Sequence, residues 1–165
     1  MANPHDISAQ ELEREAWALP PAWTRVTGAI IGAALEVHSA LGPGLLERLY
    51  EVALAHELQP RGLRIERQRS LRLSYKGIAL SPITLDLAVE GLVVVELKCV
   101  EVVHPSHLAQ LVSYLRAADL PVGLLLNFHE PHLKNGLYRR INQEAYAKHG
   151  FDFSATSPRN SASSK

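Results

Sequence analysis

Three ionisable side chains interrupt an otherwise apolar stretch, TLDLAVEGLVVVELKCV, at residues 84–100. Asp86 stands in one run of strand-forming residues, and Glu96 and Lys98 stand in the next. An ionised carboxylate in apolar surroundings is costly unless it is paired, hydrogen-bonded or bound to a metal ion. Two carboxylates and a lysine in adjacent core-like strands therefore indicate a site with chemistry to perform, or a salt bridge.

The alternation of apolar residues predicts how the two runs pair. Side chains alternate between the two faces of a strand. Six apolar residues of the hairpin share one face when the numbers of opposing residues sum to an even number, of which 182 is the simplest case, and a slip of one residue would undo this pattern. That register leaves a three-residue connection, 90–92, in which Gly91 is free to take positive φ. We therefore expect Asp86 to face Glu96, on the side opposite a single apolar face formed by Leu85, Leu87, Val89, Val93, Val95 and Leu97.

Two carboxylates this close repel each other, and a divalent cation relieves the repulsion. Ligation by oxygen atoms alone suits Mg²⁺ or Mn²⁺. Lys98, on the same face, could orient an attacking water or stabilise charge on a phosphorane-like transition state. The alternative is a plain salt bridge from Lys98 to either acid, and the hairpin alone leaves both interpretations open.

The flanking sequence predicts helices that would position this hairpin. Apolar residues at helical spacing end at the GPG of residues 42–44, where glycine and proline stop a helix. A second helix follows and ends near Pro60, and a third opens at Pro105. The expected core positions are Val26, Ala29, Ile30, Ala33, Ala34, Val37 and Leu41 in the first helix, Leu45, Leu46, Leu49, Val52, Ala53 and Leu58 in the second, and Leu108, Leu111, Val112 and Leu115 in the third.

Strand patterns are expected at about 64–75, 82–89 and 92–99, and PVGLLLNF at 121–128 reads as a short buried strand. The segment LKNGLYRRI, 133–141, fits either a strand or a helix. The element order α-α-β-β-β-α-β predicts an α/β (α+β-like) fold, with a small mixed central sheet flanked by helices.

The composition indicates one globular domain. Apolar residues make up 47% and charged residues 21% of the 165 residues. We expect an acidic, flexible arm at 1–24, the domain at 25–153, and a disordered tail at 154–165. No apolar run reaches the roughly 18 residues that span a membrane, and the first residues lack the pattern of a signal peptide. A cytoplasmic protein is expected, and the single cysteine, Cys99, excludes an intrachain disulfide.

Charge is balanced overall and uneven along the chain. The formal net charge is zero, so no global electrostatic term favours a polyanionic partner. The segment from Arg61 to Lys76, however, has six basic residues and one acidic residue, a local charge of +5. Such a segment can bind a phosphate backbone, or it can be the solvated face of a strand. Lys134, Arg139 and Arg140 could bracket a backbone together with it.

The pattern of Asp86 followed by Glu96-Leu97-Lys98 resembles the core of the PD-(D/E)XK nucleases, which have the restriction-endonuclease-like fold. GPGLLERLYEVALAHEL resembles the signature of the GxxExxY protein family within that superfamily, with Gly44, Glu47 and Tyr50 at the named positions. LNFHEPHLKNGLYRRI resembles the downstream region of the family. The resemblance runs from about residue 27 to residue 141, and Leu85 stands where the superfamily name has proline.

This resemblance implies a metal-dependent nuclease that hydrolyses phosphodiester bonds of nucleic acid, expected to be DNA. Asp86, Glu96 and the Leu97 carbonyl would hold Mg²⁺ or Mn²⁺, with Lys98 assisting the attacking water. Glu47, on a helix, would complete the metal site. In HLAQLVSY, Gln110 and Tyr114 match a Q-x-x-x-Y pattern that implies a role in positioning substrate. Tyr50 is expected to help position substrate as well, packing beside the site with its hydroxyl bonded near it.

Two other interpretations stay open. The chain could be a catalytically weak or inactive module that keeps the nuclease fold and binds nucleic acid or a partner. It could also be a structural domain that forms a homo-oligomer through the edge of the hairpin. A zinc site at His104 and His107 is not favoured, because no cysteine and no second pair of ligands accompanies these two histidines.

Overall fold

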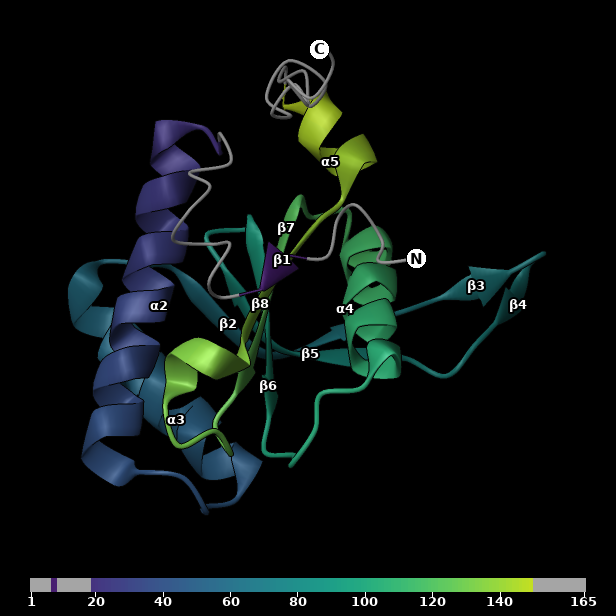
Figure 1. Cartoon of the computed structure of the whole chain (residues 1–165). Coiled ribbons are helices and arrows are strands. Elements are labelled where there is room, and N and C mark those ends of the chain that lie inside the picture. The colour runs from purple at the N-terminus through teal and green to yellow at the C-terminus, as the bar shows by residue number, and fades with distance from the viewer. Residues whose placement is uncertain (1–6, 9–18, 150–165) are drawn as a thin grey trace, which may run out of the picture.

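The protein is built around one mixed β-sheet with helices on both faces (Figure 1). The computed structural model describes residues 7–8 and 19–149. Six strands follow the order β1-β8-β7-β6-β5-β2, with β6 and β7 parallel and the other neighbours antiparallel. Their bounds are β1 (Ile7–Ser8), β2 (Ile65–Leu71), β5 (Ile83–Val89), β6 (Val93–Lys98), β7 (Val122–Asn127) and β8 (Leu137–Ile141).

Helices α2 (Pro21–Leu41) and α3 (Glu47–Leu58) cover one face of the sheet, and α4 (Pro105–Ala118) covers the other. Proline at the start of α2 and α4 suits the first helical turn, where its missing N–H has no partner to lose. One apolar cluster lies beneath α2 and α3, and a second lies beneath α4. The predicted mixed sheet between helices, and the predicted element order, are confirmed.

The remaining elements are short. Two 3₁₀ turns, η1 (Gln59–Arg61) and η2 (Leu133–Gly136), and the terminal helix α5 (Gln143–Lys148) complete the domain. The segment 133–141, which fitted either a strand or a helix, forms η2 and then strand β8. The expected strand 64–75 is divided, because β2 ends at Leu71 and the chain then forms a separate hairpin of β3 (Ser74–Tyr75) and β4 (Ile78–Ala79).

The hairpin of β5 and β6 has the predicted register. Leu87 pairs with Val95, Ala88 with Val94 and Val89 with Val93, so opposing residue numbers sum to 182. Three residues, 90–92, connect the strands, and Gly91 has a positive φ of 61°.

The expectation that Leu85 shares the apolar face of its neighbours is wrong. Leu87 and Val89 pack beneath α2 and α3, whereas Leu85 packs in the cluster beneath α4. The ladder between β2 and β5 explains the change of face. Residues on either side are paired, but the pairing is interrupted where Gln68 stands opposite Asp86, since no pair joins these two residues among the described strands. Gln68 has a φ of 48°, a left-handed conformation that reorients the strand beyond this point.

The predicted core face of α3 is also wrong in most positions. Leu45, Leu46, Leu49 and Val52 are exposed, with exposed fractions from 38% to 61%, and Leu41 at the end of α2 is exposed too. Of the expected positions, Leu58 is buried and Ala53 is partly buried. The reason is an aromatic contact, since the Tyr50 ring stacks on Phe128 with centroids 4.4 Å apart and fixes the rotation of the helix. The buried residues of α3 are Tyr50, Glu51, Leu54, Ala55 and Leu58.

The ends of the chain are described only in part. Within the arm expected at 1–24, residues 7 and 8 pair with β8, and α2 already begins at Pro21. The rest of that arm before Leu19, and the tail expected at 154–165, lie outside the described residues. Of the helices that the structure describes, none is both long and apolar enough to cross a lipid bilayer.

Candidate active site

Asp86 reaches from β5 to the backbone of β6. Its Oδ2 atom accepts a hydrogen bond of 2.8 Å from the N–H of Leu97. This bond lies just beyond the last paired residues of the two strands, Leu87 and Val95, so the carboxylate takes the place of the next ladder contact. Burial raises the pKa of Asp86, while the Leu97 N–H and the charge of Lys98 oppose the rise.

Glu96 is a buried carboxylate that is only half satisfied. It is 4% exposed, and its Oε1 atom accepts a bond of 2.7 Å from Nζ of Lys98. Its Oε2 atom is buried and has no hydrogen-bond partner within the part of the chain that the structure describes. Burial, reinforced by the charge of Asp86, raises the pKa of Glu96 to about 7. Because an unsatisfied buried oxygen is costly, this atom marks a position that a proton or a cation would stabilise.

Lys98 is the cation among these carboxylates. Burial alone would lower its pKa, but the hydrogen bond to Glu96 and the charges of Glu96, Glu47 and Asp86 raise it on balance. The ammonium therefore stays protonated at neutral pH. The salt bridge that sequence reasoning offered as an alternative is present, and it neutralises only one of the three nearby acids.

Glu47 reaches the carboxylates of Asp86 and Glu96 from a helix, α3, rather than from the sheet. It is the first residue of α3, and the backbone of Cys99, directly after β6, tends to lower its pKa. Burial raises the pKa of Glu47, and the charge of Asp86 adds to this, whereas Lys98 opposes it. Four ionisable groups from three elements, namely Glu47, Asp86, Glu96 and Lys98, are thus coupled at the point where β5 and β6 part.

The loop before α3 holds Glu47 in position. The Tyr50 hydroxyl donates to the carbonyl of Gly42 and accepts a bond of 3.1 Å from the N–H of Leu45. Gly44 has a φ of 104°, which side-chain-bearing residues rarely adopt, so this loop requires glycine. Tyr50 is fully buried, so its contacts are with this loop and the core rather than with solvent.

Comparison with known proteins agrees with this geometry. A model of the PD-(D/E)XK nuclease superfamily matches residues 24–141. The chain belongs to this superfamily. The mixed sheet flanked by helices is consistent with the restriction-endonuclease-like fold that its members share. Neither the search of curated proteins nor the search of solved structures found a match.

Sequence reasoning missed two residues that border the site of this superfamily member. Glu51 is buried, and its carboxylate accepts bonds of 2.9 Å from Arg67 and 2.6 Å from Gln68. Gln68 also tends to lower the pKa of Asp86, and it stands opposite Asp86 in the ladder between β2 and β5, so it lies beside both acids. Glu51 follows Glu47 by four residues and thus shares its helix face, a signal that the wrong assignment of the α3 core face concealed.

The predicted substrate-positioning pair lies on α4. The Gln110 amide donates a bond of 3.0 Å to the Tyr114 hydroxyl, and both side chains are partly buried. Among residues 19–149, no hydrogen bond joins this pair to the acids of the site. His107 accepts a bond of 3.1 Å from the N–H of His104 and caps the helix, and His38 contacts the Glu130 carbonyl at 2.7 Å. These two histidines have structural roles.

The donors of the site suit a hard divalent cation. Within the described residues, no three His, Cys, Asp or Glu side chains converge into a complete metal centre. Two carboxylates, with a backbone carbonyl between Glu96 and Lys98, leave room for water ligands, as Mg²⁺ and Mn²⁺ prefer. The unsatisfied Oε2 atom of Glu96 supplies the specific observation that a cation would fit here.

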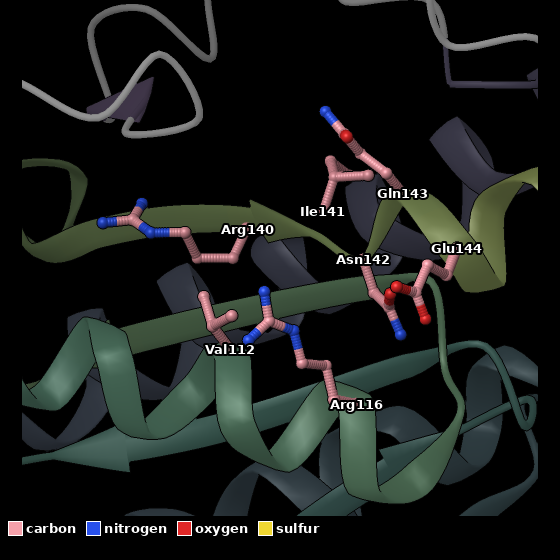
Figure 2. A pocket seen from close by; sticks show the side chains of 7 residues that line it. All are labelled: Val112, Arg116, Arg140, Ile141, Asn142, Gln143 and Glu144. Atoms are coloured by element: carbon pink, nitrogen blue, oxygen red, sulfur yellow. The ribbon is translucent and has the colours of Figure 1, made fainter.

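Two pockets lie away from this cluster. One is lined by residues of α4, the end of β8 and the start of α5, and Figure 2 shows Arg116 and Arg140 among its walls. The other lies between the end of α2 and η2 and includes His38 and Lys134. Neither pocket includes a residue of the predicted metal site.

Proposed function

We propose that this member of the PD-(D/E)XK superfamily is a metal-dependent nuclease that hydrolyses phosphodiester bonds, with DNA as the expected substrate. One observation carries the proposal: the buried Oε2 atom of Glu96 lacks a partner, although Asp86 and Lys98 flank the same carboxylate. A purely structural ion pair would be expected to satisfy both oxygens of an acid buried this deeply. The match at Gly44, Glu47 and Tyr50 supports a place in the GxxExxY family.

The acids have distinct roles in this proposal. Asp86, Glu96 and the Leu97 carbonyl would hold Mg²⁺ or Mn²⁺, and Glu47 would support the metal or its waters. When bound, such an ion lowers the pKa of water and offsets the charge of the phosphate. Asp86 is oriented for this role by the Leu97 N–H, which occupies one of its oxygens and leaves the other available.

Lys98 acts as a donor rather than as a base. Because the surrounding acids raise its pKa, its ammonium keeps its protons at neutral pH. It can therefore hold the attacking water by a hydrogen bond, or donate to a phosphate oxygen whose negative charge grows during attack. Gln110 and Tyr114 would position the nucleic acid from α4.

The decisive experiment is a cleavage assay on labelled single- and double-stranded DNA and RNA, each with Mg²⁺, Mn²⁺ or EDTA. Asp86→Asn and Lys98→Met test the site, and Glu101→Gln serves as a control, because Glu101 is an exposed acid just beyond β6. Metal-dependent cleavage by the wild type and the control, lost in both site variants, would support the nuclease. Absence of cleavage on every substrate would refute it.

A second function is favoured by the ion pair between Lys98 and Glu96. At 2.7 Å this contact keeps one oxygen of Glu96 from a metal, as expected of a module that has the fold without catalysis. Thermal unfolding distinguishes the two cases, because a ligand that binds only the folded state raises the Tm. A Mn²⁺-dependent rise in Tm that Asp86→Asn abolishes favours the nuclease, and no rise favours the inactive module. The cytoplasmic location and a homo-oligomeric state stay predictions.

A further inference from the structure

We propose that the β3–β4 hairpin is an arm that grips double-stranded nucleic acid while the bond to be cleaved lies at Asp86 and Glu96. The inference rests on the proposed nuclease function and adds to it a substrate class, the duplex, and a binding element. Throughout, the arm means residues 72–82, which connect β2 to β5.

Strand β2 leads directly from the candidate active site to the arm. Gln68, which hydrogen-bonds to Glu51 and stands opposite Asp86 between two paired positions of the ladder, lies in the middle of β2. The ladder continues to the pair of Leu71 and Ile83, and there the chain leaves the sheet. Figure 1 shows the hairpin standing away from the sheet and from the helices. The arm is therefore a continuation of a strand that also borders the site.

The arm has a defined conformation. Ser74 pairs with Ala79 and Tyr75 with Ile78, and the N–H of Leu80 donates a bond of 2.9 Å to the Leu73 carbonyl. The turn residues, 76 and 77, have φ values of 46° and 83°, as a two-residue hairpin turn of the favoured type requires. A two-stranded hairpin of this length adds little to the stability of the fold. Its presence is therefore better explained by a role in binding.

The tip exposes large apolar side chains. Tyr75 and Ile78 are 61% and 65% exposed, and Leu80 is exposed beside them. Exposed apolar groups that gather on one element indicate a contact surface rather than a solvated face. Tyrosine and isoleucine can pack on the sugars and base edges of a groove, or wedge against a base step.

The charge of the arm identifies a polyanion as its partner. From Arg67 to Leu85 the chain has four basic residues and no acidic residue. Arg67 pairs with Glu51 and Arg69 with Glu66, so these two charges are partly offset. Arg72 and Lys76 form no ion pair among the described residues, and Nζ of Lys76 lies 5.5 Å from the centre of the Tyr75 ring. Cations beside apolar groups on one ribbon match phosphates beside a groove.

The length of the arm favours a duplex. Tyr75 follows Gln68 by seven residues, and at roughly 3.3 Å per residue the tip lies up to about 23 Å from the acids. A turn of B-form duplex is about 34 Å long, and its major groove admits a two-stranded ribbon. A stiff duplex that places one phosphate at Asp86 keeps its grooves at this distance, whereas a flexible single strand does not hold a fixed position there.

The test measures binding and chemistry separately, on the full chain. Fluorescence anisotropy in EDTA gives Kd for a labelled duplex of about 30 base pairs and for one of its single strands. Hydrolysis of bis(p-nitrophenyl) phosphate with Mn²⁺ reports on the site alone, because this ester is too small to reach the arm. The arm variants are Arg72→Ala/Lys76→Ala and Tyr75→Ser/Ile78→Ser. The controls are Arg25→Ala and Val52→Ser, exposed residues on α2 and α3.

We expect each arm variant to raise the duplex Kd about tenfold, with single-strand Kd and ester hydrolysis unchanged. The cation variant should also reduce the slope of log Kd against log salt concentration by about two. The controls should match the wild type in all three measurements. Asp86→Asn should show the reverse pattern, with hydrolysis lost and duplex affinity kept.

Other outcomes overturn the inference, and they separate its failure from that of the proposed function. Duplex Kd unchanged in both arm variants of a protein that still cleaves refutes the arm alone. Equal losses of duplex and single-strand affinity refute the preference for a duplex. Loss of a dimer in light scattering, with duplex affinity intact, would assign the arm to contacts between copies. A wild type that neither binds nor hydrolyses refutes both proposals.

Discussion

The metal-free protein should lose stability as the pH rises from about 4.5 to neutrality, because Glu96 must ionise inside the fold. The pKa of Glu96 rises from 4.5 to about 7, so between these values the folded state holds a proton that the unfolded state has released. Stability falls with pH wherever the folded state binds more protons. A difference of about 2.5 pKa units corresponds to about 3 kcal/mol, lost progressively between about pH 4.5 and pH 7 and absent above that.

The substitution Glu96→Gln isolates this effect. Glutamine keeps the shape and can still accept from Lys98, but it has no charge to bury. The variant should be less sensitive to pH than the wild type and more stable by up to about 3 kcal/mol at pH 8. Asp86 and Glu47 also have raised pKa values, so a smaller slope of the same sign should remain. The raised pKa of Lys98 adds no slope here, since this group is protonated in both states below about pH 9.

Urea unfolding in EDTA at pH 5, 6, 7 and 8 measures the effect, with Glu101→Gln as the control for removal of an exposed acid. Saturating Mn²⁺ should restore the stability of the wild type at pH 8 and should leave Glu96→Gln less affected. A wild type whose stability rises from pH 5 to pH 8, or a Glu96→Gln variant with the full wild-type slope, would refute the assignment of a strained carboxylate.

Three further substitutions test the rest of the site and its support. Lys98→Met should lower nuclease activity by at least about 100-fold while Mn²⁺ still raises the Tm, which would separate its donor role from metal binding. Tyr50→Phe removes the hydroxyl between Gly42 and Leu45 and should cost about 1–3 kcal/mol in urea unfolding, with lower activity. Leu54→Ala should cost about 2–5 kcal/mol, whereas Leu49→Ala should change stability by less than about 0.5 kcal/mol; similar costs would contradict the observed rotation of α3.

The register of β5 and β6 could be predicted because burial strongly specifies it. Alternation in both strands allows only pairings that keep the apolar residues together, and the connection through Gly91 is compatible with one of them. The change of face at Leu85 could not be predicted in this way. It depends on the left-handed conformation of Gln68, a residue type with no special preference for that region, on a strand other than the one being analysed.

The rotation of α3 about its own axis could not be predicted from the spacing of apolar residues, for a different reason. Leu45, Leu46, Leu49 and Val52 form one apolar set, and Tyr50, Leu54 and Leu58 form a competing one. The contact that favours the second set joins Tyr50 to Phe128, which is distant in sequence. Helical patterns show which faces are apolar, whereas the partner across the core selects between them.

The error in the core face of α3 and the failure to find Glu51 have one physical cause. The rotation that buries Tyr50 and Leu54 also brings Glu47 and Glu51 near enough for their charges to act on Asp86 or be acted on by it. The same rotation exposes two large apolar side chains of α3, Leu49 and Val52, for which a helix selected only for stability would have little reason. Shielded acids at one end of α3, and an exposed leucine and valine on its other side, are together expected of a helix whose orientation serves the site. The arrangement of α3 thus supports the proposal that the carboxylate cluster, rather than the packing of the core alone, is what this fold maintains.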